Sequence, residues 1–306
     1  MPLPMSWSRT HAHGSQPSPR SQRVSLSLAI ALTSVVMVVE AIGGWWANSL
    51  SLVSDAGHML SDVAALGMAL FAVVMAQRPA SARRTYGWHR LEILAALSNG
   101  VVLIVIALLI LGRAWKLLQN PQPVSGGIVL IVASLGLATN LIGMRLLAHD
   151  RSCNVRSARL HLLGDALSSV GVLVAGAVIY LTGWFAIDAL LSLVIAAIIM
   201  FGAFGILRET VDILLESTPP GLSPPDVAGA IQCVAGVRAV HDLHIWSITS
   251  GMTALSGHVK VEDEALSRSD EVLNAVKATL RDRFGIEHTT IQLESLDYTE
   301  VGEFHT

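Results

Sequence analysis

Six long stretches of the chain are dominated by apolar residues, and short polar segments separate them. Each stretch is about 20 residues or longer, the length that a helix needs to cross the roughly 30 Å hydrocarbon core of a bilayer. Turn-forming pairs such as Asn48-Ser49 and Thr182-Gly183 lie between them. The pattern therefore predicts six transmembrane helices, over roughly residues 24–46, 52–76, 93–115, 126–147, 160–181 and 185–207.

Basic residues between these stretches indicate the orientation of the predicted helices, because Lys and Arg concentrate in short cytoplasmic loops. On one side of the membrane, the tail and the segments after the second and fourth stretches contain Arg9, Arg20, Arg23, Arg78, Arg83, Arg84, Arg90, Arg151, Arg156 and Arg159. The other side offers Arg113 and Lys116. We therefore expect the N-terminus to be cytoplasmic and, with six spans, the C-terminal part as well.

The C-terminal part has the shorter periodicity of a water-soluble domain. Apolar and polar residues alternate around Val240, Ile245 and Val259, as expected for half-buried strands. The expected elements are helix 224–234, strand 237–247, strand 253–262, helix 266–283 and strand 288–294. This α-β-β-α-β order predicts an open α+β layer that is ferredoxin-like or metallochaperone-like. The predicted fold class is an all-α membrane domain followed by a cytoplasmic α+β domain.

Charge divides the chain at the same place. Counted with neutral histidine, residues 1–208 have a net charge of +7 and residues 209–306 a net charge of −10. We therefore predict a disordered cytoplasmic tail over 1–23, a membrane domain over 24–208 and a cytoplasmic domain over 209–306. The lipid bilayer is the expected partner of the middle part, and the acidic last part argues against nucleic acid. The two cysteines, Cys153 and Cys233, form no CxxC pair, which disfavours a thiolate metal site or a disulfide framework.

Two of the apolar stretches contain the same ionisable pair. His58 and Asp62 lie in the second stretch and His161 and Asp165 in the fifth, each pair four residues apart and so on one helix face. Ionisable residues inside a membrane are costly and indicate function. If the two faces meet, two imidazoles and two carboxylates form a set of ligands that Zn²⁺ accepts. A hydrogen bond between helices is the alternative for one pair alone, whereas two pairs favour a metal site.

Three motifs together resemble the cation diffusion facilitator family of metal/proton antiporters. They are the two HxxxD fragments, TYGWHRLEILAAL after the second stretch, and HDLHIWSITSG in the C-terminal part. The resemblance covers about residues 24–295. It implies a six-span homodimer that exports Zn²⁺ or a similar divalent cation from the cytoplasm, with protons as counter-ion. The transport site of the family would fall on His58, Asp62, His161 and Asp165.

The resemblance also implies sites outside the membrane. His258 and Glu294 match positions that bind zinc in relatives, and with His241 they are candidates for a cytoplasmic site where Zn²⁺ would regulate the dimer. Since His241 and His244 are three apart on a strand, they should point to opposite faces. His89 is a candidate for an interface site. These residues could equally be ordinary surface histidines.

The segment after the second stretch carries two further expectations from the resemblance. Arg90 and Glu216 match the positions of a salt bridge that couples this segment to the soluble domain. Where some bacterial relatives place an Asp and two His, this chain has Ser81, Arg84 and Trp88, so that second zinc site is expected to be missing.

Three more acidic residues lie in or near the apolar stretches. We expect Asp55 to line the access path or to hydrogen-bond a neighbouring helix, and Asp188 to be interfacial, while the role of Glu40 is left open.

The ligands themselves suggest how transport would work. A metal binds deprotonated imidazole and carboxylate, so that loading releases protons and protons can displace the metal on the other side. The prediction is a secondary transporter that works by alternating access rather than an enzyme. A membrane metal sensor or an intramembrane zinc hydrolase is the alternative, although the chain has no HExxH, HxxEH or GxSxG motif. The short tail and the lack of targeting signals suggest a bacterial inner membrane.

Overall fold

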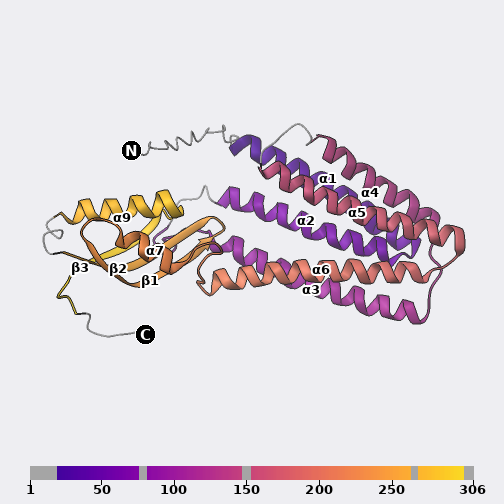
Figure 1. Ribbon diagram of the computed structural model, residues 1–306. Coiled ribbons are helices and arrows are strands. Elements are labelled where there is room, and N and C mark those ends of the chain that lie inside the picture. The colour runs from indigo at the N-terminus through magenta and orange to yellow at the C-terminus, as the bar shows by residue number, and fades with distance from the viewer. Residues whose placement is uncertain (1–18, 76–80, 147–152, 263–267, 300–306) are drawn as a thin grey trace, which may run out of the picture.

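The computed structural model describes residues 19–75, 81–146, 153–262 and 268–299. Six long helices make up the first part of this chain, and a small domain with a β-sheet continues from one end of them (Figure 1). The helices are α1 (Pro19–Ala47), α2 (Leu50–Met75), α3 (Arg90–Gln119), α4 (Gly126–Leu146), α5 (Cys153–Thr182) and α6 (Ala186–Leu214).

The helices have the length and the surface expected in a bilayer. They contain 21 to 30 residues, and at 1.5 Å per residue even the shortest is about 32 Å long. Large apolar side chains such as Leu109, Leu181 and Phe201 are exposed on the outside of the bundle. Within the described ranges, Arg90–Gln119, Leu163–Thr182 and Ala186–Leu214 are long and apolar enough to cross a membrane. That all six helices span it stays a prediction.

Small residues let the helices approach one another closely. The most extensive contacts join α3 with α6, α4 with α5 and α1 with α2. At Gly126 of α4, an added Cβ would lie 2.8 Å from the backbone nitrogen of Tyr180 in α5. At Gly100 of α3 it would lie 2.9 Å from Leu207 of α6. Such contacts hold membrane helices together because apolar side chains gain little by leaving lipid.

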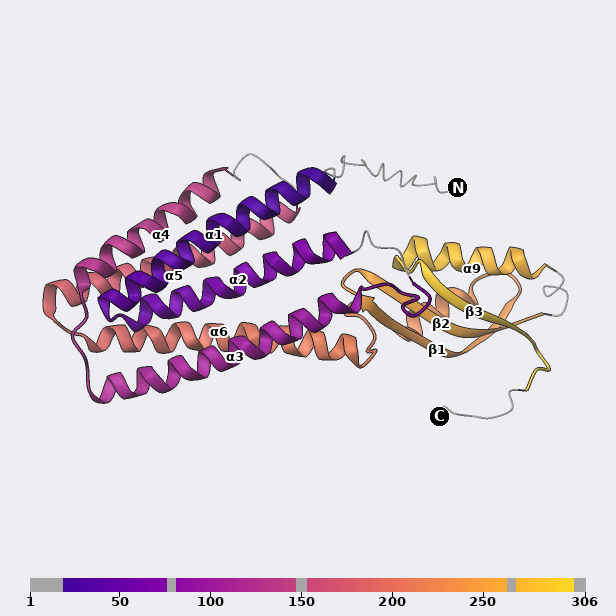
Figure 2. The ribbon, with the colours of Figure 1, turned by 180° about the vertical axis from the view of Figure 1, so that it is seen from behind.

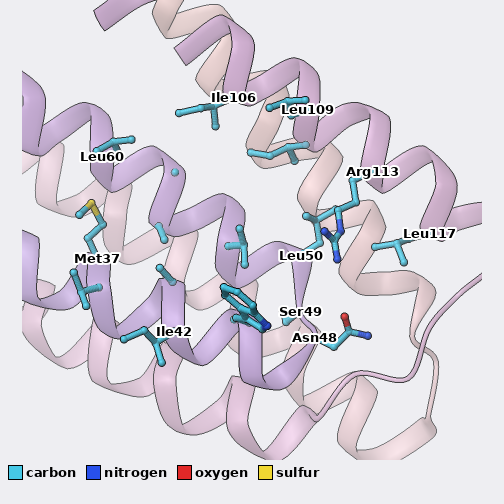
Figure 3. A pocket seen from close by; sticks show the side chains of 18 residues that line it. Met37, Ile42, Asn48, Ser49, Leu50, Leu60, Ile106, Leu109, Arg113 and Leu117 are labelled. Carbon is cyan, nitrogen blue, oxygen red and sulfur yellow. The ribbon is translucent and has the colours of Figure 1, made fainter. Parts of the chain in front are cut away.

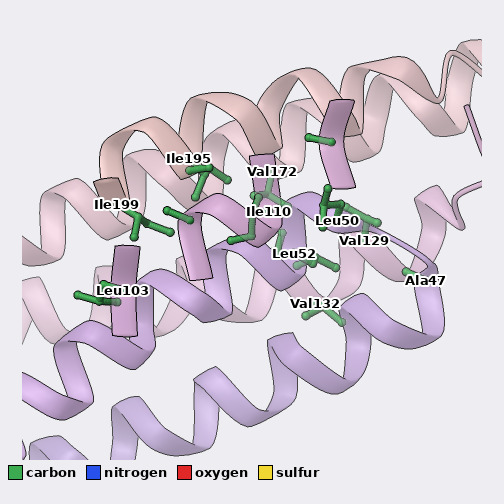
Figure 4. Packing of buried hydrophobic residues seen from close by; sticks show 14 of the residues in the cluster. Ala47, Leu50, Leu52, Leu103, Ile110, Val129, Val132, Val172, Ile195 and Ile199 are labelled. Carbon is green, nitrogen blue, oxygen red and sulfur yellow. The ribbon is translucent and has the colours of Figure 1, made fainter. Parts of the chain in front are cut away.

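The buried apolar side chains of the bundle form a cluster to which all six long helices contribute (Figure 4). Leu52 of α2, Leu103 of α3 and Val129 of α4 are almost fully buried there. Val172 of α5 and Ile199 of α6 belong to the same cluster. This cluster fixes the relative positions of the helices that carry the predicted transport residues.

A buried carboxylate joins α6 to the first turn of α2. Asp188, 1% exposed, accepts hydrogen bonds from the Ser49 hydroxyl, the Leu50 N–H and the Ser51 hydroxyl, each at 2.6 Å. The first N–H groups of a helix have no partner within the helix, so that an acceptor at this place stabilises the helix start. Asp188 lies at a helix end, as expected for an interfacial residue, but its side chain is buried.

The second part of the chain is a three-stranded sheet with two helices. Strands β1 (Val237–Thr249) and β2 (Met252–Val261) pair antiparallel, and β3 (His288–Ser295) pairs parallel with β2. Helices α7 (Pro224–Gln232) and α9 (Ser269–Phe284) contact each other and the sheet. Val227, Leu255, Val276 and Leu280 form part of the core between them.

Three contacts join this domain to the helices near α3 and α6 (Figure 2). Arg90 at the start of α3 pairs with Glu216 after α6, at 2.8 Å. The Thr249 hydroxyl at the end of β1 donates to Glu92 of α3 at 2.6 Å. The rings of Tyr86 and His288 meet edge to face at 5.2 Å. The sheet domain therefore contacts α3 and the segment before it, while the pair of Arg90 and Glu216 joins the start of α3 to the segment that follows α6.

The element order α7-β1-β2-α9-β3 confirms the predicted order of the C-terminal part. Most boundaries differ by one to several residues from the sequence expectations, and two of the differences cross the predicted domain limits. Helix α1 starts at Pro19, within the predicted tail, and α6 continues to Leu214, past residue 208. Helical hydrogen bonding does not require an apolar sequence, so that a helix can continue beyond its lipid-embedded part.

Candidate metal centres

The bundle brings together three of the four residues predicted as transport ligands. His58 and Asp62 on α2 and Asp165 on α5 each have a donor atom within 4.8 Å of the others. The His58 Nε2 atom lies 3.7 Å from the Asp165 Oδ1 atom. Asp62 is 9% exposed. A metal ion placed between these atoms would meet one imidazole and two carboxylates.

Helix periodicity and packing together create this cluster. His58 and Asp62 are one turn apart on α2, so their side chains share a face. Contact between α2 and α5 brings Asp165 against that face. Asp165 is half-buried, as is His58, so the cluster is inside the bundle and still reachable. His161, the fourth predicted ligand, lies in α5 one turn before Asp165, and its side chain is outside the described part of the structure.

Two more buried carboxylates lie one turn farther from the sheet domain. Asp55 on α2 is 4% exposed and accepts a hydrogen bond of 2.5 Å from the Ser168 hydroxyl of α5. This contact agrees with one of the two roles expected for Asp55, a hydrogen bond to a neighbouring helix. Glu40 on α1 is 1% exposed.

A second cluster lies on the sheet of the C-terminal domain and contains His241 of β1, His258 of β2 and Glu294 of β3. Their donor atoms also lie within 4.8 Å of one another. The His258 Nδ1 atom is 2.8 Å and the His241 Nε2 atom 3.3 Å from different oxygens of Glu294. His241 and His258 are paired residues of the antiparallel ladder, and their rings meet at 5.2 Å. Glu294 is 3% exposed, so its charge is held inside the sheet domain.

A bulge in β1 separates His244 from this cluster. The ladder register shifts between His241 and His244, and Asp242 has a φ of 49°, in the left-handed region. The Asp242 Oδ1 atom accepts a hydrogen bond of 2.9 Å from the His244 Nε2 atom. The other carboxylate oxygen of Asp242, Oδ2, lies 3.9 Å from the His258 Nε2 atom. A bulge re-aims side chains and disturbs the alternation that sequence reasoning assumes. Because His241 pairs with His258 and His244 pairs with Ser256, the bulge places His241 and His244 on the same face of the sheet, so the expectation of opposite faces is wrong. His244 is nevertheless not one of the three grouped donors.

Both clusters have the donor chemistry of a Zn²⁺ site. Imidazole nitrogen and carboxylate oxygen are ligands of Zn²⁺, which prefers four of them in a tetrahedron. Each described cluster supplies three donors and would leave a position for a further ligand. In the helical cluster two carboxylates would balance the double charge of the ion.

The other residues expected near the interface show a mixed result. Arg90 and Glu216 form the predicted salt bridge. His89 precedes α3, and within the described residues it belongs to neither of the two groups of three ligands. Arg84, at a position where relatives carry a ligand, lies with its guanidinium 3.3 Å over the ring of Trp88.

A large cavity has none of the residues of either cluster in its lining. It has a volume of about 980 Å³ and lies between α1, α2 and α3, open on the outside of the bundle (Figure 3). Its lining is mostly apolar, with Ile42, Leu60 and Leu109 among the side chains, and Arg113 lies at one end. An apolar cavity of this kind suits lipid chains or another apolar surface rather than a hydrated cation.

Sequence reasoning missed how the clusters are supported. The burial of Asp188, the contact of Glu92 with Thr249 and the bulge at Asp242 could not be read from spacing. The available signal for Asp188 and Glu40 was their presence in or beside apolar stretches, which marks a residue as unusual without naming its partner.

Comparison with known proteins identifies the architecture. Residues 26–215 match the family description "Cation efflux transmembrane domain", and residues 219–296 match "Cation efflux protein, cytoplasmic domain". The fold is thus a transmembrane cation efflux domain followed by a cytoplasmic domain that contains helices and a three-stranded sheet.

Several curated proteins are similar to the chain over most of its length. The metal cation efflux system protein CzcD of Cupriavidus metallidurans is 40% identical over 286 residues, which cover 93% of this chain and 89% of that protein. The zinc transporter ZitB of Escherichia coli is 37% identical over 290 residues, covering 93% and 92%. The cadmium, cobalt and zinc/H(+)-K(+) antiporter of Bacillus subtilis is 38% identical over 275 residues, covering 88% of each chain. The chain therefore belongs to the cation efflux family.

Among solved structures, the metal-bound C-terminal domain of the CzcD transporter matches this chain at 42% identity. The match covers 24% of this chain and 99% of that one, with a TM-score of 0.22.

Proposed function

We propose that this protein exports a divalent cation, Zn²⁺ in the first place, from the cytoplasm in exchange for protons. The observation that supports this most directly is the group of His58, Asp62 and Asp165, whose donor atoms lie within 4.8 Å of one another across two helices. Membership of the cation efflux family supports the direction of transport. The printed name of one relative, a zinc/H(+)-K(+) antiporter, supports the proton as counter-ion.

The transport site consists of His58, Asp62, His161 and Asp165. His161 precedes Asp165 by one helical turn on α5, just as His58 precedes Asp62 on α2. An imidazole at that position would complete four ligands, which fill the shell of Zn²⁺ and leave no open position for hydrolytic chemistry. A transported ion fits this arrangement better than a catalytic one.

Proton exchange follows from the ligand types. Imidazole and carboxylate bind a metal only when they are deprotonated, so that cation loading from the cytoplasm releases protons. On the opposite side, protons entering the site compete with the cation and favour its release. An alternating opening of the bundle would expose the same ligands first to one side and then to the other.

Family membership and the bundle also support the setting of this activity. All six helices are proposed to span a bacterial inner membrane, with the N-terminus and the sheet domain in the cytoplasm. The match to the family's cytoplasmic domain and the acidic composition of residues 209–306 support the placement of that domain. A homodimer is proposed, assembled in part through the sheet domain.

The His241, His258 and Glu294 cluster is proposed as a second, regulatory zinc site. Its three donors come from three different strands, so a bound ion would tie all strands of the sheet together. The domain contacts Glu92 of α3 through Thr249, which offers a route from the sheet to the membrane helices. His89 has no comparable support from the described contacts and is kept as a weaker candidate for an interface site.

Flux measurements in proteoliposomes test the transport proposal. The wild-type protein should move Zn²⁺ in response to an imposed pH difference. Asp165→Asn removes one anionic ligand at nearly constant size and should abolish the flux, as should His161→Ala. Asp226→Asn, at an exposed position on α7, is the matched control and should leave it unchanged.

Three results would decide against parts of the proposal. Flux that ignores the pH difference would refute proton exchange. Full flux in Asp165→Asn would refute the assignment of the site. Zn²⁺ binding without any flux in the wild type would favour a metal sensor instead.

A further inference from the structure

Glu40 is a buried carboxyl group that no step of the proposed transport cycle uses. It lies on α1, is 1% exposed, and its Oε2 atom has no hydrogen-bond partner among the described residues. An ionised carboxylate inside a low-dielectric bundle is very unfavourable without a cation or several hydrogen-bond donors. Glu40 therefore requires a positive partner of some kind.

The surroundings of Glu40 leave room for its carboxyl group rather than for an apolar side chain. Gly136 of α4 faces it so closely that an added Cβ would collide with the Glu40 Oε1 atom. The same position is 3.5 Å from the Ser169 hydroxyl oxygen of α5. The side chain thus reaches from α1 past α4 toward α5, and the absence of a side chain at Gly136 makes that possible.

The charged groups around Glu40 are negative. Besides burial itself, the charges that bear on Glu40 are the carboxylates of Asp55 on α2 and Asp165 on α5. The described residues of α4 include one charged side chain, Arg145, which is exposed and more than two turns from Gly136. None of the Lys or Arg side chains described in the structure is buried. A proton is therefore the simplest positive partner when no metal ion is present.

Glu40 also lies on the side of the cation cluster where counter-ions would enter. Asp55, its neighbour on α2, is three residues before His58, and so one turn farther from the sheet domain. With the sheet domain in the cytoplasm, this layer lies between the cluster and the opposite side of the membrane. Glu40 itself is outside the group of residues that would bind the metal.

We propose that Glu40 carries one of the counter-ion protons of the transport cycle. Without a bound cation it is a neutral carboxylic acid. When a divalent cation occupies the cluster of His58, Asp62 and Asp165, the proton leaves its carboxyl oxygen for water and Glu40 becomes a carboxylate. No other bond changes. The proposal rests on the proposed proton exchange and adds to it a proton position outside the metal ligands.

Electrostatics gives the expected size of the coupling. As a general reference, a double positive charge at a separation of about 10 Å and an effective dielectric constant of about 20 favours the ionised form of a carboxyl group by more than about a hundredfold. Cation binding would thus be sufficient to empty a proton position that is filled in the cation-free protein. Conversely, a proton on Glu40 would weaken cation binding by the same factor, because the linkage is reciprocal.

Infrared difference spectroscopy tests the proposal on the full-length protein in detergent. Addition of Zn²⁺ to the wild type should remove a band of a protonated carboxyl group. Glu40→Gln keeps the size of the side chain but cannot bind the proton, so that the band should be absent. Glu209→Gln, at an exposed position of α6, is the matched control and should behave as the wild type.

Proton release in weakly buffered solution gives an independent measure. Glu40→Gln should release about one proton fewer per bound Zn²⁺ than the wild type or Glu209→Gln. A purely structural role of Glu40 would change stability or affinity without changing this ratio. If Glu40→Gln keeps both the band and the full proton release, the proposal is refuted.

Two further measurements keep the test decisive. If Glu40→Gln fails to fold, the wild-type difference spectrum still decides, because the absence of any lost carboxyl band would overturn the proposal. Gly136→Ala, which crowds the carboxyl group without removing it, should shift the frequency of the band, and an unshifted band would contradict the assignment to Glu40.

The outcome is separable from that of the transport proposal. If the wild type transports Zn²⁺ but Zn²⁺ binding removes no infrared band of a protonated carboxyl group, the role of Glu40 is refuted and the transport proposal stands. A zinc-induced loss of the band in a protein that shows no flux would overturn transport alone.

Discussion

Replacement of Asp188 tests whether the contact between α6 and α2 holds the bundle together. Its carboxylate accepts three hydrogen bonds of 2.6 Å, from the Ser49 hydroxyl, the Leu50 N–H and the Ser51 hydroxyl. The serines and Asp188 are each 1% exposed or less. Asp188→Ala removes the common acceptor and leaves these donors buried at the first turn of α2.

The expected loss can be worked out from these contacts. Hydrogen bonds to a charged group contribute about 1.5–3 kcal/mol each, so that the three bonds of 2.6 Å contribute at most about 9 kcal/mol. The Ser51 N–H also donates to the carboxylate, over a longer distance of 3.3 Å. The two serine hydroxyls can rotate to other acceptors, and hydrogen-bond contributions are not additive. The Leu50 N–H and the lost charge at the helix start remain uncompensated. We expect Asp188→Ala to lower the free energy of unfolding by about 3–5 kcal/mol. For Asp188→Asn, which keeps one acceptor oxygen, we expect about half of this decrease.

Thermal unfolding followed by tryptophan fluorescence in detergent is a suitable assay, at one fixed scan rate. For a domain of about 200 residues, 1 kcal/mol corresponds to a change in Tm of about 2–4 °C. Asp188→Ala should therefore lower Tm by about 6–20 °C. Asp212→Ala, at an exposed position of the same helix, should change Tm by less than about 2 °C. If both variants unfold at the wild-type temperature, Asp188 does not stabilise the start of α2 and the reasoning is wrong.

Three further predictions concern helix packing, the junction and the second cluster. Gly126→Ala should lower the free energy of unfolding by about 1–3 kcal/mol, because its Cβ would meet the backbone of α5, whereas Gly127→Ala, which meets nothing within 4 Å, should be nearly neutral in the same unfolding assay. Arg90→Ala should change the free energy of unfolding by less than about 1 kcal/mol, because the ion pair of Arg90 with Glu216 is about half exposed. The same variant should reduce Zn²⁺ flux, and unchanged flux and dimer yield would count against a coupling role. His258→Ala should bind one Zn²⁺ fewer per chain in equilibrium dialysis, because it removes one of the three donors, while His244→Ala should not.

The sequence was sufficient for features that depend on neighbours along the chain. Apolar stretches of bilayer length predicted the six long helices. Within the described residues, three of these helices are long and apolar enough to cross a membrane. Alternation around Val240 and Val259 predicted two of the strands. The spacing of His58 and Asp62 placed both on one face of α2, because the α-helical repeat alone fixes that relation.

Only the tertiary structure decided which groups meet across elements. The approach of Asp165 to His58 depends on how α2 packs against α5, and the burial of Glu294 depends on the pairing of β3 with β2. The bulge at Asp242 breaks the strand alternation on which face assignments rest.

The residues that surround the Glu40 and Asp188 side chains were also decided only by the tertiary structure. Their side chains meet residues that are about 95 to 140 positions away in the sequence, such as Gly136 and Ser49. The physical reason is that backbone periodicity is local, whereas interhelical contacts depend on small residues and buried polar groups whose effect appears only when the helices are packed.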